Sequence, residues 1–168
     1  MTYWRGVVLG LVVIVVSGCT FNSGQLDALR EAFKPTLANQ YGWVAQYGQT
    51  QRGVVAIVQG DLVVFANEQG DAISFDGWVI SRVTGFDLAD PLTVQAPPGA
   101  RRYGNGRLTT AHACTAWGKL ADTHMGWQQH CESEFSYQNV ITLDDQGRII
   151  QINQVVEPSG TRLILTKR

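Results

Sequence analysis

The chain has 168 residues, with 13 basic and 14 acidic side chains and a formal net charge of −1 at pH 7. This balance leaves no basic excess to hold phosphates, which argues against a nucleic-acid partner. Charged residues make up only 16% of the chain and glycine occurs 18 times, a composition that favours short strands joined by tight turns over long helices.

The N-terminal residues have the pattern of a bacterial lipoprotein leader. Arg5 supplies a positive charge ahead of the apolar run Gly6–Val16, which is too short to cross a bilayer because a transmembrane helix needs about 20 apolar residues. The run ends in Val16-Ser17-Gly18-Cys19, which looks like the lipobox at which a lipoprotein precursor is cut before its cysteine. We therefore predict a signal peptide over residues 1–18 and a diacylglycerol on the Cys19 thiol.

Acylation of Cys19 would fix where the protein resides. A mature bacterial lipoprotein carries three acyl chains, and two or more chains hold a protein stably at a membrane. Thr20 is not the aspartate that resembles an inner-membrane retention signal, so we expect an outer-membrane lipoprotein facing the periplasm, with membrane lipid as a partner. Residues 19–24 would form a short tether, and residues 25–168 a single domain. Loss of the leader removes one of the 13 basic residues, so 12 remain against 14 acidic residues and the net charge becomes −2.

One amphipathic helix is expected at the start of the domain. Asn22 begins a capping-box pattern, Leu26, Leu29 and Phe33 fall on one helical face, and Pro35 ends the segment. We interpret this helix as an element that packs its apolar stripe across a sheet. A recognition helix beside the anchor is the alternative.

A series of β-branched and aromatic runs follows from Gly53 onward. Polar turns that contain glycine separate the runs, and the pair Asp76-Gly77 is the strongest hairpin signal, because both residues tolerate the positive φ of a type I′ turn. The pattern predicts a meander of antiparallel strands over residues 54–58, 62–66, 72–75 and 78–83.

The middle of the chain is rich in residues that interrupt strands. Asp90-Pro91 and Ala96–Ala100 break any regular run, and Arg101-Arg102 follows them directly, close to further glycines. We predict a long exposed loop here, serving as a crossover within one domain. The two arginines could meet an anionic glycan or a lipid headgroup, or they could form an ordinary solvated pair.

Two cysteines remain once Cys19 is acylated. Cys114 and Cys131 are an even pair in an oxidising compartment, which predicts one disulfide. The flanking segments 108–117 and 127–140 alternate as two strands of a hairpin, whose apex would lie near Asp122-Thr123. If residue 114 faces residue 131, equal steps along both strands place residue 112 opposite 133 and residue 116 opposite 129.

The three histidines near these cysteines do not have zinc-ligand spacing. A Cys₂His₂ site needs closely spaced ligand pairs, and strand alternation also turns His130 away from the face of Cys131. A cysteine nucleophile with a histidine base is also disfavoured, because oxidation to a disulfide would leave no free thiol. We expect neither a metal nor another cofactor.

The C-terminal part predicts three strands and two turns. Strands are expected over residues 137–143, 148–156 and 161–166, with a hairpin loop at Asp144–Gly147 and a turn at Pro158–Gly160. The aspartates of the hairpin loop lack the further oxygen donors of a calcium loop, so we interpret them as turn formers.

Two stretches resemble the YjbF/GfcB lipoproteins, the group 4 capsule lipoprotein family. The first is Asp76–Leu88, an alternating strand with a basic residue, Arg82, and a Gly-aromatic turn. The second is the tail, in which Asn139, Gly147-Arg148 and the final Leu165–Lys167 fall in a matching order. The resemblance implies an outer-membrane lipoprotein of exopolysaccharide or capsule export, with an all-β antiparallel half-barrel similar to the carriers LolA and LolB. It implies no catalytic residues.

Three functions remain open at this point. The favoured one is a non-enzymatic accessory protein that binds a glycan or polysaccharide export proteins. Its contacts would include Trp78, Arg82, Arg101 and Arg102, with Trp43, Trp117 and Trp127 as further aromatic candidates, although core packing is the ordinary role of a tryptophan. A lipid or acyl-chain carrier would instead need a continuous apolar cavity of roughly 300 Å³ or more. A polysaccharide-modifying enzyme would need paired carboxylates, whereas the acids here fall in predicted turns.

Overall fold

The structure, a computed structural model, describes residues 42–105, 109–120 and 125–168. The predicted helix, Cys19 and the Asp122-Thr123 apex lie outside these residues. The described residues form antiparallel strands without a helix, so the all-β prediction is confirmed. The strands are β1 (Trp43–Tyr47), β2 (Thr50–Gln59), β3 (Leu62–Ala66), β4 (Ala72–Phe75), β5 (Ile80–Thr84), β6 (Leu92–Gln95), β7 (Ala100–Gly104), β8 (Thr109–Cys114), β9 (Gly118–Lys119), β10 (Gly126–Glu132), β11 (Ser136–Leu143), β12 (Ile149–Val155) and β13 (Arg162–Lys167).

The strands close into a ring, which corrects the predicted half-barrel. Neighbouring strands pair in chain order from β1 to β8 and again from β10 to β13. The ring is completed by two further pairings, β13 with β1 and β8 with β10. The short strand β9 lies beyond β8 along the same side of β10. An open half-barrel has two edges, and here long-range pairings at β1–β13 and β8–β10 remove them. The β1–β13 pairing joins segments far apart in the chain, which local sequence patterns do not encode.

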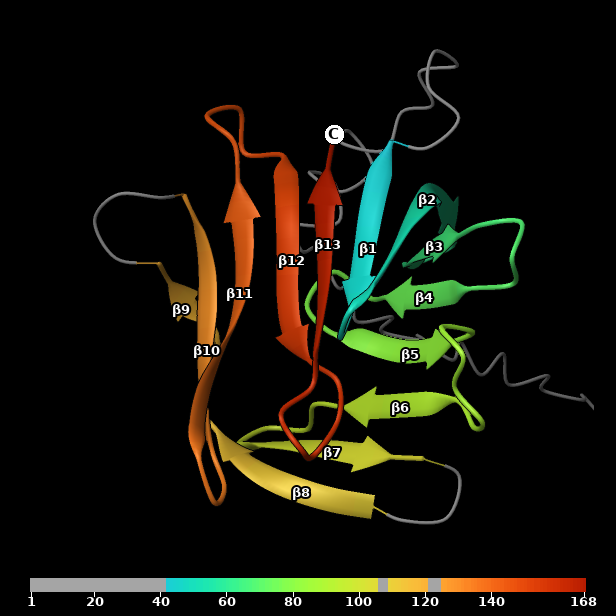
Figure 1. Cartoon of the computed structure of the whole chain (residues 1–168). Helices are drawn as coiled ribbons and strands as arrows, with labels where there is room; N and C mark the ends of the chain where they lie inside the picture. The colour runs from blue at the N-terminus through green and yellow to red at the C-terminus, as the bar shows by residue number, and fades with distance from the viewer. Residues whose placement is uncertain (1–41, 106–108, 121–124) are drawn as a thin grey trace, which may run out of the picture.

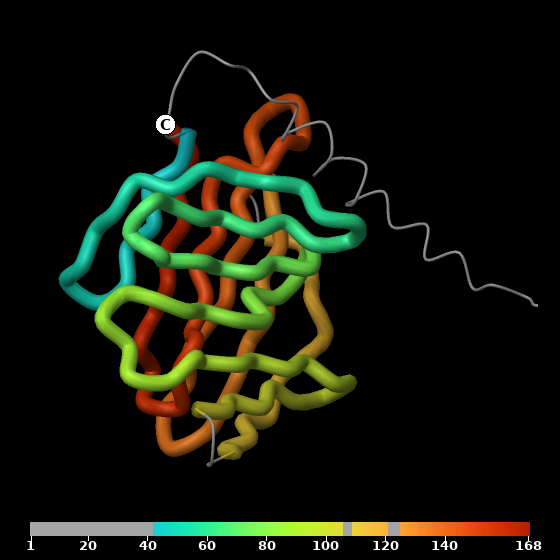
Figure 2. The backbone as a smooth tube through the Cα atoms, turned by 90° about the vertical axis from the view of Figure 1, so that its right-hand side faces the viewer, coloured from blue at the N-terminus to red at the C-terminus, as the bar shows by residue number. Residues whose placement is uncertain are grey.

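The ring is flattened into two layers whose strands cross steeply (Figure 1). The strands β10–β13 and β1 run roughly upright, while β3–β8 run across them. Seen from the side, the second group lies in front of the first (Figure 2). β2 turns the corner, because its first half pairs with β1 over residues 50–54 and its second half pairs with β3 over residues 55–59.

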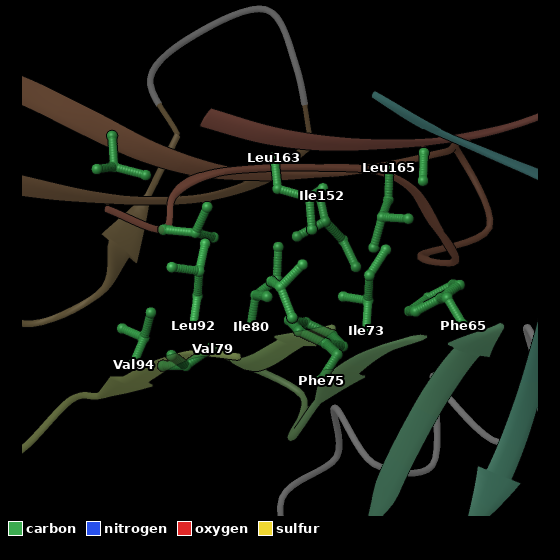
Figure 3. Packing of buried hydrophobic residues seen from close by; sticks show 14 of the residues in the cluster. Phe65, Ile73, Phe75, Val79, Ile80, Leu92, Val94, Ile152, Leu163 and Leu165 are labelled. Carbon is green, nitrogen blue, oxygen red and sulfur yellow. The ribbon is translucent and has the colours of Figure 1, made fainter. Parts of the chain in front are cut away.

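Alternating side chains from the two layers meet in the core between them. The inward residues of β3–β6, among them Phe65, Ile73 and Phe75, face Ile152 and Leu165 of the upright strands (Figure 3). These side chains are fully buried. Burying a large apolar side chain contributes about 1.5–3 kcal/mol, so this layer-to-layer contact is what holds the ring flat.

The two strongest predicted turns have different outcomes. The Asp144–Gly147 loop is confirmed: Oδ1 of Asp144 accepts the N–H groups of Gln146 and Arg148, and Gly147 has φ 77°. The type I′ turn at Asp76-Gly77 is wrong, because only Gly77 has a positive φ. Instead, the Asp76 N–H donates to the carbonyl of Val79 and its carboxylate caps the turn, so β5 begins only at Ile80.

The long exposed loop predicted from Asp90-Pro91 through Arg101-Arg102 is also wrong. β6 and β7 fill most of this region, and the prolines are confined to its turns. Pro91 immediately precedes β6, and the N–H of Ala100 donates to the carbonyl of Pro97 to close the connection into β7. A proline just before a strand or inside a turn removes no ladder hydrogen bond, which is why the strands survive beside it.

The segment predicted as a single strand over residues 127–140 is two strands, β10 and β11. A turn at residues 133–135 separates them, and the Ser133 N–H donates to the carbonyl of Phe135. Cys114 does face Cys131, as predicted. The equal steps also hold at Ala113–Glu132 but fail further along β10, because residues 115–117 bulge between β8 and β9 and Gly118 lies opposite Gln128.

Candidate functional site

A buried arginine lies at the centre of the interior. The alternation of β7 turns Arg101 inward and leaves its neighbour Arg102 outside. The guanidinium of Arg101 is fully buried and donates to the side-chain oxygens of Gln154 at 2.8 Å and Gln129 at 3.2 Å. No carboxylate of the described residues lies within ion-pair distance of it. Burial lowers the pKa of Arg101, because removing a cation from water disfavours its charged form.

Gln154 is the hub of the polar network around this cation. Its Oε1 accepts hydrogen bonds from Arg101 and from the N–H of Ile80, and its Nε2 donates to the carbonyl of Trp78 at 2.7 Å. The side chain therefore joins β12 to β7 and to the β4–β5 turn across the interior. Asn139 extends the network, since it donates to Gln129 and accepts the N–H of Val155.

A second chain of hydrogen bonds involves His112. The hydroxyl of Tyr103 lies 2.6 Å from that of Tyr137, which lies 2.9 Å from Nδ1 of His112. All three side chains are buried. Burial raises the pKa values of both tyrosines and lowers the pKa of His112. With neutral His112 accepting at Nδ1, each tyrosine can donate one proton along the chain, so every group is satisfied.

The buried histidine predicts a pH dependence of stability. The unfolded chain takes up a proton on His112 near pH 6.5, whereas the folded chain takes it up only at lower pH, because its pKa is lowered. The free energy of unfolding should therefore fall as the pH drops below about 6.5, by up to ~1.4 kcal/mol per pH unit from this group. Urea unfolding at pH 7.5 and 5.5 measures the slope, which should be smaller in His112→Gln. Equal slopes in the two proteins would contradict the assignment.

Three tryptophans form a cluster at one end of the strands that run across. We call Trp78, Trp117 and Trp127 the tryptophan cluster. The ring centroid of Trp78 lies 5.5 Å from that of Trp117 and 5.3 Å from that of Trp127. They come from the β4–β5 turn, the bulge between β8 and β9, and β10, and all three are only partly buried.

The cluster is anchored by hydrogen bonds to the backbone of Trp78, and its rings remain partly exposed. The carboxylate of Asp76 accepts the backbone N–H of Trp78, whose carbonyl is bound by Gln154. Within the described part of the chain, no acceptor bonds the indole N–H of any of the three tryptophans. The cluster therefore offers apolar ring surface together with N–H donors, the combination that suits a ligand with both apolar and hydroxyl faces.

The predicted contact residues are not brought together. Arg82 and Arg102 are exposed on the outer face of β5 and β7, with β6 between them, and no described contact joins either to Trp78. Arg101 is withdrawn into the interior. Trp43 is 3% exposed and packs edge-on against Phe65, so it is a core residue.

The predicted disulfide lies at the junction that closes the ring. Cys114 at the end of β8 is bonded to Cys131 of β10. Only two residue pairs join these strands, Cys114–Cys131 and Ala113–Glu132. The covalent bond thus reinforces one of the two shortest pairings in the ring, the other being β5–β6.

The described residues carry neither a metal-ligand cluster nor a membrane-spanning helix. In the ranges 42–105, 109–120 and 125–168, no group of three or more His, Cys, Asp or Glu side chains could hold a metal ion. No helix in those ranges is long and apolar enough to cross a membrane. The buried acid Asp71 is held by Asn67, the Phe86 N–H and Arg52, which is a structural arrangement.

Comparison with known proteins adds a fold relationship. No protein-family model and no curated protein matches the chain. Among solved structures, the chain is similar to the crystal structure of the hypothetical lipoprotein YmcC from Escherichia coli (K12), with a TM-score of 0.55 and 11% sequence identity. The match covers 82% of this chain and 86% of that chain. At this identity the likeness establishes a shared fold.

Proposed function

We propose that this protein is an outer-membrane lipoprotein, facing the periplasm, that binds a polysaccharide chain as an accessory component of exopolysaccharide or capsule export. Three features support the proposal: the lipobox at Cys19, the fold shared with a protein described as a hypothetical lipoprotein, and the tryptophan cluster. The cluster carries it, because partly exposed indole rings can pack against the apolar faces of sugars while their N–H groups donate to hydroxyls.

The interior favours a binding protein over a lipid carrier. A carrier of the expected kind needs a continuous apolar cavity, whereas among the described residues apolar side chains from both layers meet (Figure 3) and a hydrogen-bonded arginine is buried with them. An acyl chain placed there would displace core side chains and separate the Arg101 guanidinium from its hydrogen-bond partners. A buried cation without partners would lower the stability of the fold.

Substitution of Trp117 tests the proposed function. Trp117→Ala removes one partly exposed ring from a bulge that carries no ladder pairing, so the fold should persist. We expect the affinity for purified extracellular polysaccharide to fall at least about tenfold, the equivalent of ~1.4 kcal/mol. Titration of the change in tryptophan fluorescence measures it. Ile57→Ala is the matched control, because Ile57 is 45% exposed on β2, outside the cluster.

Two further readouts separate the competing functions. Polysaccharide recovered after incubation should keep its chain length, and shortening would indicate an enzyme instead. The acylated protein purified from membranes should carry only the chains bound at Cys19. Free lipid extracted from it in stoichiometric amount, together with equal polysaccharide binding by Trp117→Ala and the unaltered chain, would support the carrier and overturn the proposal.

A further inference from the structure

A pocket lies at the other end of the strands that run across, remote from the tryptophan cluster. It has a volume of about 370 Å³ and is bounded by the β5–β6 connection, the facing ends of β7 and β8, and the β12–β13 turn. The β4–β5 turn and the β5–β6 connection leave opposite ends of β5, so the pocket and the cluster are separate sites (Figure 1). The volume is near the lower end of the range of about 300–1,000 Å³ that is usual for small-molecule sites.

The floor of the pocket is apolar and buried. Leu92, Tyr103 and Val156 line it and are buried in the surrounding structure. The hydroxyl of Tyr103 is engaged with that of Tyr137, so what Tyr103 can offer a ligand is its ring. A ligand therefore needs one apolar face.

The rim of the pocket is polar and carries negative charge. Asp90, Asn105, Thr110, Glu157 and Ser159 line it. The Glu157 carboxylate already accepts hydrogen bonds from Ser159 and Thr161, whereas the Asp90 carboxylate has no partner among the described residues. Asn105 and Thr110 add donors and acceptors in the same rim.

The wall that carries Asp90 is built on an unusual backbone. Gly85, Phe86 and Asp87 have φ values of 78°, 50° and 60°, which is the left-handed region that residues with a β-carbon rarely adopt. The buried carboxylate of Asp71 holds this turn by accepting the N–H of Phe86 at 2.6 Å, and Arg52 pairs with Asp87 at 3.1 Å. Strained backbone that is held in place by its surroundings is concentrated at binding sites, and this turn leads directly into the wall of the pocket.

The lining selects among ligand classes. No lysine or arginine is among the described lining residues, and two carboxylates are, so an anionic ligand such as a uronate or phosphate is disfavoured. The polar rim excludes an acyl chain, because its groups would lose water without gaining partners. A neutral sugar fits both parts: its C–H face packs on the floor, and its adjacent hydroxyls donate to Asp90 and exchange hydrogen bonds with Asn105.

We propose that this pocket is a second ligand site, which binds one neutral sugar residue with Asp90 as the principal hydrogen-bond acceptor. The ligand class follows from the lining of the pocket and does not depend on the tryptophan cluster. The two proposed binding sites can therefore be tested independently of each other.

The test titrates the folded protein with glucose, galactose and N-acetylglucosamine, and with glucuronate and putrescine as charged probes. At least one neutral sugar should shift the backbone amide resonances of Asn105 and Thr110 saturably, and more tightly than either charged probe. Asp90→Asn should weaken its binding about 10- to 100-fold, the loss expected for a hydrogen bond to a charged acceptor. Ala89→Trp, at an exposed position in the wall, should abolish binding by filling the pocket.

A matched control makes the result specific. Asp61→Asn changes an exposed carboxylate outside the lining and should leave the affinity unchanged. The inference is overturned if no neutral sugar shifts these amides, if glucuronate or putrescine binds more tightly than the sugars, or if Asp90→Asn binds as well as the unaltered protein.

Discussion

Replacing Gln154 with alanine is expected to lower the free energy of unfolding by about 3–5 kcal/mol. The change removes one acceptor and one donor that serve three groups: the Arg101 guanidinium, the Ile80 N–H and the Trp78 carbonyl. Each buried polar group left unpaired costs about 1–3 kcal/mol, and more when it is charged. Urea unfolding at pH 7.5 measures the loss.

Gln151→Ala is the matched control for this substitution. Gln151 is the same residue type in the same strand, but it is only partly buried and makes no side-chain hydrogen bond within the described part of the chain. Its truncation should change stability by less than about 0.5 kcal/mol. Similar losses in both variants would mean that the network contributes nothing beyond ordinary strand packing.

A double substitution separates the cation from its partners. Arg101→Met combined with Gln154→Leu removes the buried charge together with the hub, and should be more stable than Gln154→Leu alone. The reason is that breaking a buried polar pair leaves an uncompensated charge, whereas replacing both partners with apolar groups does not. Additive losses would contradict the coupling that the 2.8 Å contact implies.

Removing the disulfide is the second large expected effect. Cys114→Ala with Cys131→Ala should cost about 3 kcal/mol, because the bond closes a loop between residues 17 apart and limits the freedom of the unfolded chain. The effect should also be structural, since only two residue pairs otherwise join β8 to β10. Denaturant midpoints measure the stability, and hydrogen exchange of β8 amides measures opening of the junction.

Chemical reduction provides the control for the cysteine substitutions. Dithiothreitol should lower the midpoint of the unaltered protein to near that of the double variant and leave the double variant unchanged. An unaltered protein whose midpoint does not respond to complete reduction would show that the β8–β10 junction is stable without the bond.

Local chemistry made some elements predictable. The hairpin loop at Asp144–Gly147 follows from an aspartate that caps two N–H groups and a glycine with positive φ, all within four or five residues. The strand at Leu62–Ala66 was predicted with its observed bounds, because its β-branched run is flanked by turn residues on both sides. The disulfide was predicted because two cysteines remain after acylation of Cys19 and the expected compartment is oxidising.

Other elements depend on contacts that are distant in sequence. β6 and β7 were missed because Pro91, Pro97 and Pro98 looked like strand breakers, although they occupy turns. Closure at β1–β13 could not be predicted, because these strands lie at opposite ends of the described chain, whereas the facing of Cys114 and Cys131 was predicted from the cysteine pair. Arg101 was predicted to be a surface residue, because its hydrogen-bond partner Gln154 is 53 residues away in the sequence.

The tryptophan cluster was only partly predictable from the sequence. The sequence identified the individual tryptophans as candidate contacts, but not that Trp78, Trp117 and Trp127 converge while Trp43 enters the core. Alternation within β1 would have placed Trp43 inside, had that strand been recognised. The pocket beside Asp90 could not be predicted. The positive φ values of Gly85, Phe86 and Asp87, which lead into its wall, are visible only in the structure.

The position of the disulfide also bears on when this chain can acquire its final shape. A polypeptide that is secreted must cross the membrane before it becomes compact, and thiols remain reduced in the cytoplasm. Because only two residue pairs join β8 to β10, and one of them is the cysteine pair, oxidation reinforces the closure of the ring. If the protein is exported as proposed, this reinforcement is added only after the chain has left the cytoplasm.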